Sequence, residues 1–210
     1  MLETQARGGG WAIDKKTLLP LEAPEGLSEE RARDWYRERN FIVRPIVLIT
    51  TVNKEGTPNV SVKTNFMTVG SMRRYAFCCS SEHHTYQNIV ETGEFVINIA
   101  TEDIVREVLK AAMITVKPCP PGLSEVERAG LTAVPSEKVR PPRVGECIAH
   151  YECVLDWRKG DLIVGRVVAV SANESLMDGT DARRPIVVGG GRVDSYAVVG
   201  EAKKWPKVSL

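Results

Sequence analysis

Residues 84–98 read HTYQNIVETGEFVIN, in which a single glycine separates two kinds of local pattern. Thr85–Glu91 is predicted to form a short helix, because Gly93 suits the left-handed position that follows a helix end. The apolar and β-branched residues of Glu94–Ala100 predict a strand directly after it. This stretch therefore predicts a helix that leads into a sheet.

Upstream of this stretch the pattern is that of strands. Ile46–Val52 is apolar and β-branched, Lys54–Pro58 has turn composition, and Asn59–Val69 resumes with alternating Val and Thr residues. Arg74–Ser80 predicts one more strand before residue 84. These segments predict a sheet built from strands and tight turns.

The N-terminal part differs from this sheet region. Residues 1–27 are rich in Gly and Pro and predict an arm draped over the protein or flexible. Ser28 can cap a helix that runs to Asn40 and carries Trp35 and Tyr36 toward a core. We therefore predict an arm and short helix over residues 1–40 and one main domain over residues 41–210.

Downstream, one more long helix and three more strands are predicted. Thr101–Met113 has apolar residues at helical spacing, with Thr101 available as N-cap. Ser124–Glu127 has the capping-box form, with Gly130 ending that small helix. The predicted strands are Glu146–Trp157, Asp161–Ala172 and Pro185–Val188. Because strands outnumber helices and do not alternate with them, the pattern favours a closed antiparallel barrel over a parallel doubly wound sheet.

Composition excludes several classes of partner. The chain has 210 residues, with 28 Lys and Arg against 27 Asp and Glu, so its net charge of +1 predicts neither nucleic acid nor an anionic membrane as partner. No apolar run approaches the roughly 20 residues of a membrane-spanning helix, and residues 1–10 lack a signal-peptide pattern. We therefore expect a cytoplasmic protein. The five cysteines form no C-x-x-C pair and predict reduced, mostly buried thiols.

The stretch between Ser80 and Thr85 is the clearest candidate binding site. It reads SSEHHT and lies where a predicted strand ends and a predicted helix begins. Free amides at a helix start favour an anion such as phosphate, and Ser80, Ser81, His83, His84 and Thr85 add polar donors. The alternative is that Ser81 or Thr85 caps the helix and the histidines are exposed. A metal site at the histidines is disfavoured, because no ligand partners recur at suitable spacing.

Several segments together resemble the flavin-reductase-like family, whose fold is the FMN-binding split barrel. They are RPIVLITT at residues 44–51, GTPNV at 56–60, and residues 84–98 quoted above. The resemblance continues through GLT at 130–132, YEC at 151–153, PIVVGGG at 185–191 and Tyr196. It covers roughly residues 40 to 200 and implies a mainly β protein, a Greek-key antiparallel split barrel with a few peripheral helices.

The resemblance also implies where flavin mononucleotide (FMN) would bind without a covalent link. The strand that begins at Asn59 would pass the isoalloxazine ring, and the backbone near Lys63, Thr64, Asn65 and Phe66 would contact it. Ser80, Ser81, His84 and Thr85 are the phosphate candidates, with Asn98 and Lys63 ranked after them and His83 beside them. Arg192 and Tyr196 would either reach the site across a dimer interface or lie on the surface.

Two positions depart from the family pattern. Relatives often carry a basic residue shortly before the threonine, where this chain has Glu82, His83 and His84. A phosphate beside a histidine raises the imidazole pKa, so FMN affinity is predicted to fall as pH rises through the bound-state pKa. The second departure is Asn65, where many relatives have a large aromatic residue.

The leading functional interpretation is an FMN-dependent oxidoreductase that accepts hydride from NADH or NADPH and passes it to a flavin or another acceptor. Because the cofactor carries the chemistry, no dedicated general acid or base is expected. One alternative is an electron carrier that a partner protein reduces. Another is a barrel that has lost flavin and serves a structural role. The resemblance implies a homodimer in each case.

Overall fold

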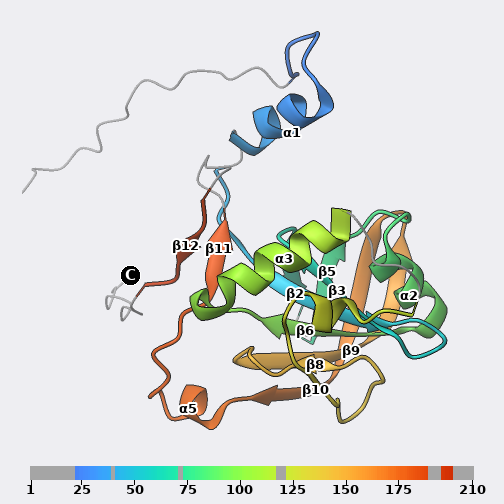
Figure 1. The fold of residues 1–210 in the computed structure, drawn as a ribbon, viewed down its shortest axis with the longest axis vertical. Helices are drawn as coiled ribbons and strands as arrows, with labels where there is room; N and C mark the ends of the chain where they lie inside the picture. The colour runs from blue at the N-terminus through green and yellow to red at the C-terminus, as the bar shows by residue number, and fades with distance from the viewer. Residues whose placement is uncertain (1–21, 39–40, 71–72, 117–121, 189–194, 201–210) are drawn as a thin grey trace, which may run out of the picture.

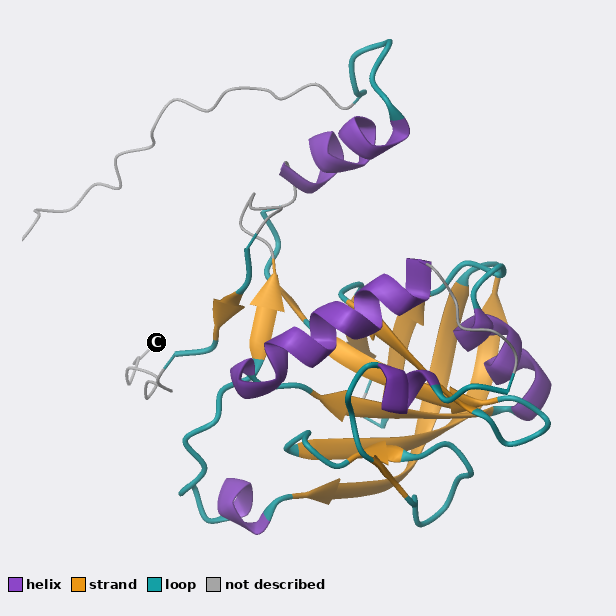
Figure 2. Ribbon diagram, in the orientation of Figure 1, coloured by secondary structure: helices purple, strands orange, loops and turns teal. Residues whose placement is uncertain are grey.

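The computed structural model describes residues 22–38, 41–70, 73–116, 122–188 and 195–200. Figure 1 shows a curled sheet with helices at its periphery, and Figure 2 shows that strands dominate the fold. The prediction of a mainly β split barrel is confirmed.

Seven strands form one antiparallel sheet in the order β3-β2-β6-β9-β10-β5-β4. Their bounds are β2 Val47–Val52, β3 Pro58–Lys63, β4 Phe66–Val69, β5 Arg74–Cys78, β6 Glu94–Ile99, β9 Ala149–Lys159 and β10 Leu162–Ala172. The two outermost strands, β3 and β4, are consecutive along the chain, with only Thr64 and Asn65 between them. Three peptide links span at most about 11 Å. The sheet must therefore curl until its two edges meet at this point, which we call the seam.

The seam corrects one prediction. Asn59–Val69 was expected to form a single strand, whereas the structure divides it into β3 and β4 at Thr64 and Asn65. β3 pairs with β2, and β4 pairs with β5 at the other end of the sheet. The chain crosses from one sheet edge to the other without a glycine or proline to mark the break.

Alternation along β2 explains how the sheet is filled. Val47 and Ile49 pack in one apolar cluster with Phe77, Phe95 and residues of the other strands, inside the curled sheet. Leu48 belongs to a second cluster on the other face, with residues of α3. Because successive side chains of a strand point to opposite faces, a strand covered on both faces buries every side chain. All six residues of β2 are accordingly buried.

The interior of the sheet is closely packed around Phe95. Its ring makes an edge-to-face contact with Phe77, with centroids 5.5 Å apart and planes at 83°. A Cβ atom at Gly165 would collide with the Phe95 ring, so this position of β10 accepts no side chain. Core packing thus accounts for a glycine in the middle of a strand.

Apart from α5, which was not predicted, the helices occur near the predicted places. They are α1 Glu29–Glu38, α2 His84–Thr92, the 3-10 turn Glu102–Ile104, α3 Val105–Val116, α4 Glu125–Arg128 and α5 Glu174–Met177. α2 ends at Gly93, whose φ is 73° and whose amide donates to the Ile89 carbonyl, as predicted. α3 lies across the sheet next to β3 (Figure 1). Ser124 caps α4 by accepting the Glu127 amide at 3.3 Å.

α1 stands apart from the sheet in Figure 1. Its start is confirmed, because the Ser28 hydroxyl accepts the Arg31 amide at 3.3 Å. The expectation that Tyr36 faces a core is wrong, since 51% of this residue is exposed. An amphipathic pattern predicts a helix but not which surface will cover it.

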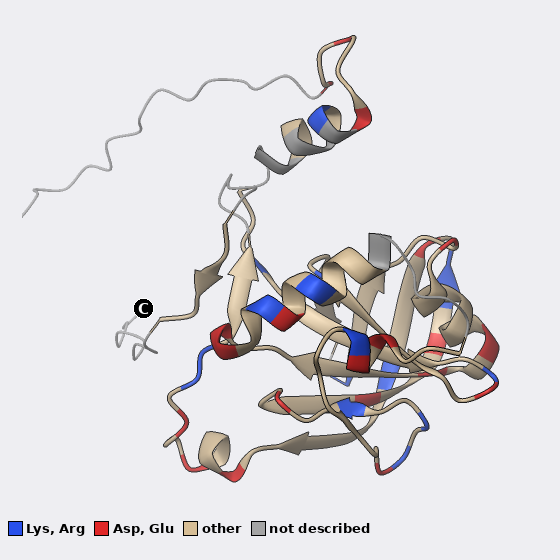
Figure 3. Ribbon diagram, viewed as in Figure 1, with Lys and Arg blue, Asp and Glu red and all other residues tan. Residues whose placement is uncertain are grey.

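Two small sheets complete the fold. β1 Arg44–Pro45, β11 Ile186–Val188 and β12 Ala197–Val198 form one, and β7 Ala133–Val134 and β8 Arg143–Val144 form the other. Basic and acidic residues are interspersed over the described ribbon (Figure 3), as the near-zero net charge predicts. Every helix in the described part of the chain is too short or too polar to cross a bilayer.

Candidate functional site

Two sizeable cavities adjoin the N-terminal end of α2. The larger, of about 350 Å³, is named the amide cavity and is lined by Asn53, Thr57, Pro58, Asn59, His84, Gln87, Asn88, Glu91, Gly122, Leu123 and Glu125. The smaller, of about 270 Å³, is named the lysine cavity and is lined by Val62, Lys63, Thr64, Asn65, Cys78, Cys79, Ser80, His83 and Asp161. Of these two cavities, His84 lines only the larger and His83 only the smaller, and both histidines also line a third space of about 10 Å³.

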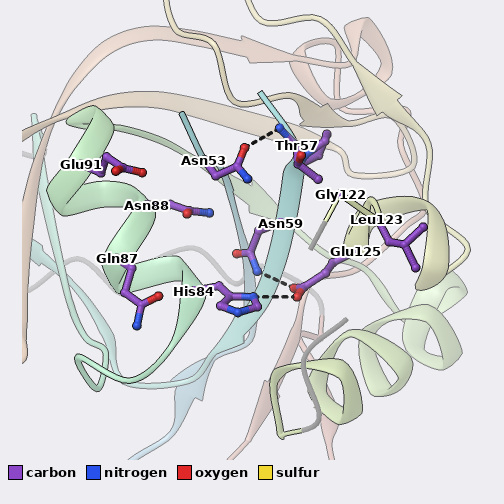
Figure 4. A pocket seen from close by; sticks show the side chains of 11 residues that line it. Asn53, Thr57, Asn59, His84, Gln87, Asn88, Glu91, Gly122, Leu123 and Glu125 are labelled. Atoms are coloured by element: carbon purple, nitrogen blue, oxygen red, sulfur yellow. Dashed lines mark hydrogen bonds and ion pairs between the residues drawn. The ribbon is translucent and has the colours of Figure 1, made fainter. Parts of the chain in front are cut away.

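In the amide cavity the buried polar groups are paired with one another (Figure 4). The Glu125 carboxylate is 4% exposed, accepts a hydrogen bond from the Asn59 side-chain amide, and lies 3.1 Å from Nδ1 of His84. The Asn59 carbonyl oxygen in turn accepts the hydroxyl of Thr51 at 3.0 Å. A buried carboxylate with several donors is stable in place without any ligand.

Thr85 belongs to the same network. It is 1% exposed, and its hydroxyl lies 2.9 Å from the Asn59 carbonyl oxygen and 2.8 Å from the Ser61 hydroxyl. The structure therefore places this predicted phosphate candidate in a buried hydrogen-bond network that links α2 to β3. Its hydroxyl is already engaged there.

The lysine cavity lies at the seam. It is lined by the end of β3, the two seam residues, the end of β5 and the residue before α2. The Asn65 side-chain amide donates to the Cys78 carbonyl at 3.1 Å, and the Cys79 amide donates to the Asp161 carbonyl at 2.9 Å. These bonds join the seam to β5 and to the turn before β10, whereas Val62 and Lys63 come from β3 at the other end of the sheet order. The cavity is thus a product of sheet closure.

Lys63 is the buried cation of this cavity. It is 6% exposed, and within the described residues no carboxylate lies within salt-bridge distance of its ammonium. Asp161 lines the same cavity but is exposed, so water screens its charge. A buried charge without a partner is costly and is typical of a binding surface.

The thiol and the imidazole beside Lys63 are uncharged. Burial raises the pKa of the Cys79 thiol, and the nearby Lys63 charge and hydrogen bond only partly oppose this. Burial also lowers the pKa of His83, with the Lys63 charge as the second cause. Sγ of Cys79 and Nδ1 of His83 are 3.9 Å apart. The cavity therefore presents one ammonium beside a neutral thiol and a neutral imidazole.

The start of α2 adds further donors. His83 occupies the N-cap position without a side-chain capping bond, and the backbone amides of His84 and Thr85 have no acceptor in the described part of the chain. Ser80 lies directly before this start, with its hydroxyl 3.4 Å from the Glu82 amide. Unpartnered amides at a helix start attract anions. The predicted alternative, a side chain of Ser81 or Thr85 capping this helix, is not observed.

Among the described residues, the other predicted site residues line neither of these two cavities. Ser81 is exposed next to Ser80, and Phe66 stacks on Tyr75 with centroids 5.1 Å apart. Asn98 is fully buried in β6, donates to the Leu48 carbonyl at 3.2 Å and accepts the Val144 amide at 2.8 Å, so it lines neither cavity. Tyr196 is 45% exposed and lines neither cavity, and Arg192 lies outside the described residues.

Sequence reasoning missed several residues that line these cavities, among them Glu125, Cys79 and Asp161. Glu125 was read only as part of a helix cap, although its carboxylate pairs with His84 across a separation of 41 positions. Cys79 and Asp161 meet at the seam through the pairing of β5 with β10. No local signal reports such contacts. Among the described residues, no group of three or more His, Cys, Asp or Glu side chains could hold a metal ion.

Comparison with known proteins assigns the chain to a family. Residues 39–194 match the model of the flavin reductase like domain. An uncharacterised protein of Halalkalibacterium halodurans is 34% identical over 164 residues, which cover 68% of this chain and 76% of that protein. Its function is not described, so it adds no activity to the comparison.

Two solved structures have the same fold. Nitrilotriacetate monooxygenase component B from Bacillus cereus is 26% identical, with a TM-score of 0.72 over 91% of this chain and 100% of that one. Flavoredoxin from Desulfovibrio vulgaris is 21% identical, with a TM-score of 0.68 over 88% and 97% of the two chains. Since the family model matches well over half of its length, this chain belongs to the flavin reductase-like family.

Proposed function

We propose that this protein binds FMN non-covalently in the lysine cavity and acts as an NAD(P)H-dependent flavin oxidoreductase. One observation carries the proposal above the others: a buried lysine without a carboxylate within salt-bridge distance lines the same cavity as His83, the N-cap residue of a helix whose first amides are free. Both features favour an anionic ligand. Family membership makes a flavin nucleotide the ligand that fits this chemistry.

The residues present fit the two ends of FMN. Ser80, Ser81, His83 and the free amides of α2 would face the phosphate. The backbone of residues 63–66 would face the isoalloxazine ring, because the break between β3 and β4 leaves peptide groups outside the sheet ladder. Such groups can pair with the uracil-like edge of the ring. Bound flavin supplies the hydride chemistry, and the chain holds, orients and shields it.

A homodimer is part of the proposal. The lysine cavity, at about 270 Å³, is below the roughly 300 Å³ at which pockets for drug-sized ligands begin. Part of an FMN molecule would therefore lie outside it, against solvent or a second subunit. Met67, Trp157 and Val170 are large apolar residues of the curled sheet that are 62%, 46% and 60% exposed. Apolar side chains exposed on a sheet are suited to a subunit interface.

The test is an anaerobic titration of the FMN-saturated protein. NADH and then NADPH are added while flavin absorbance near 450 nm is followed. Rapid bleaching by either nucleotide supports a reductase and identifies its donor. Flavin that binds but is bleached only by dithionite overturns the reductase and leaves an electron carrier, a role that the name flavoredoxin gives to one structural neighbour. A protein that binds no FMN overturns flavin binding as well.

A further inference from the structure

Lys63 differs from the other cations that the structure places beside α2. Lys54 is paired with Glu91 at 2.5 Å on an exposed surface, and the exposed Arg158 donates to the Tyr86 hydroxyl at 2.9 Å. Lys63 is buried at the end of β3, and Asp161, the carboxylate that lines the same cavity, is exposed and lies beyond salt-bridge distance of its ammonium. An ammonium in such surroundings is stabilised most by a ligand that brings a negative charge.

The two parts of a flavin nucleotide differ in charge. The oxidised ring system is neutral, whereas a phosphate monoester carries a charge between about −1.5 and −2 at pH 7. His83 cannot supply the matching charge in the free protein, because burial and Lys63 keep its imidazole neutral. The side chain of Lys63 is therefore matched to the phosphate, even though its backbone belongs to the segment expected near the ring.

We propose that Lys63 is the specificity-determining residue of the site, whose ammonium pairs with the phosphate and makes the cavity select FMN over riboflavin. This inference rests on the proposed function. In this proposal Lys63 of β3 takes the place of the basic residue that relatives often carry shortly before the threonine corresponding to Thr85. The phosphate then lies between Lys63 and the amides at the start of α2.

The experiment compares the affinities of FMN and riboflavin for three proteins by quenching of flavin fluorescence. Lys63→Met is expected to weaken FMN about 10- to 100-fold and riboflavin less than about threefold. Lys63→Arg keeps the charge and is expected to retain most of the preference for FMN. Lys54→Met makes the same chemical change at an exposed, paired lysine and is expected to change neither affinity.

Each other outcome has a defined meaning. Equal losses for FMN and riboflavin in Lys63→Met, or no loss for either, overturn the inference but leave flavin binding intact. Failure of the wild-type protein to bind either flavin overturns the proposed function instead. Circular dichroism and thermal unfolding of each variant show whether a loss reflects misfolding.

A second measurement uses the wild-type protein alone, in case Lys63→Met does not fold. Lysine acetylation is followed by mass spectrometry, with exposed Lys54 as internal reference. FMN is expected to slow the acetylation of Lys63 at least about tenfold relative to riboflavin at equal occupancy, because the paired ammonium resists deprotonation. Equal protection by both flavins means that the ring covers Lys63 and overturns the inference.

Discussion

The two cavities beside α2 differ in how their buried polar groups are satisfied. In the amide cavity Glu125, Asn59 and Thr85 hydrogen-bond to one another or to neighbouring side chains. In the lysine cavity the buried Lys63 has no anionic partner among the described residues, although this cavity is the smaller one. The two cavities therefore differ in buried charge more than in volume, and this difference is the ground on which we propose the lysine cavity as the flavin site.

The largest expected effect is the loss of stability when the Glu125 carboxylate is removed. Glu125→Ala leaves the buried Asn59 amide without its acceptor, so the free energy of unfolding is expected to fall by about 3 kcal/mol. Urea unfolding measures the loss, and flavin affinity should change less than about threefold. Glu91→Ala, on the exposed side of the same cavity, is the control. A large loss of FMN affinity in folded Glu125→Ala would transfer the binding role to the amide cavity.

Removing the Thr85 hydroxyl tests whether this residue stabilises the fold or binds the phosphate. Thr85→Val removes a buried hydroxyl that contacts Asn59 and Ser61, so the free energy of unfolding is expected to fall by about 1–2 kcal/mol. Thr85→Ser keeps the hydroxyl and should recover most of the loss in the same urea experiment. If Thr85→Val instead weakens FMN without affecting unfolding, Thr85 is a phosphate ligand.

His83 should give FMN binding a dependence on pH. Its pKa is lowered in the free protein by burial and Lys63, against the opposing charges of Glu82 and Asp161, whereas a bound phosphate would raise it. Binding then takes up a proton, so affinity is highest below the free-state pKa and is lost as pH rises through the bound-state pKa. Up to about a tenfold decrease is expected for each unit by which the two pKa values differ.

The matched variant for this prediction is His83→Asn. The ratio of wild-type to variant affinity at each pH removes the titration of the phosphate itself. A ratio that stays constant between pH 5 and pH 9 would show that the imidazole does not face the phosphate.

The smallest expected effect is that of FMN on the chemical modification of the adjacent cysteines. Cys78 is exposed, whereas Cys79 is buried and its pKa is raised by that burial. Because the thiolate is the reactive form, iodoacetamide should modify Cys78 at least about tenfold faster than Cys79. Since Cys78 lines the lysine cavity, FMN should slow its modification a few-fold. Mass spectrometry of the modified peptides measures both rates, and rapid labelling of Cys79 would mean that the seam opens to solvent.

Local patterns sufficed for most of the fold. The helix ended by Gly93, the cap at Ser124 and the apolar strands each follow from residues a few positions apart, and all are observed. The break at Thr64 and Asn65 was not predictable in this way, because the segment contains no glycine or proline. It exists because the two strands on either side pair with opposite ends of the sheet.

The candidate site was predictable only in part. Residues 80–85 were expected to form an anion site, and the free amides at the start of α2 agree with that expectation. Sequence alone could not separate His83 from His84, which line different cavities, or show that Thr85 is buried. It also could not show that Lys63 is buried and that no carboxylate of the described residues lies within salt-bridge distance of it. These properties depend on which distant segments meet, and they appear only after the sheet has closed.

The seam also has a consequence for how the protein folds. β2 with β3, and β4 with β5, are antiparallel neighbours that are close in sequence and can form early. Lys63 ends one of these hairpins and Cys79 follows the other, yet the hairpins lie at opposite ends of the sheet. The chain joins the hairpins directly through Thr64 and Asn65, whereas Asp161 reaches the lysine cavity only through the long-range pairing of β5 with β10. A partly folded chain would therefore hold most lining residues of this cavity near one another, and the cavity would be complete only when β10 has paired with β5.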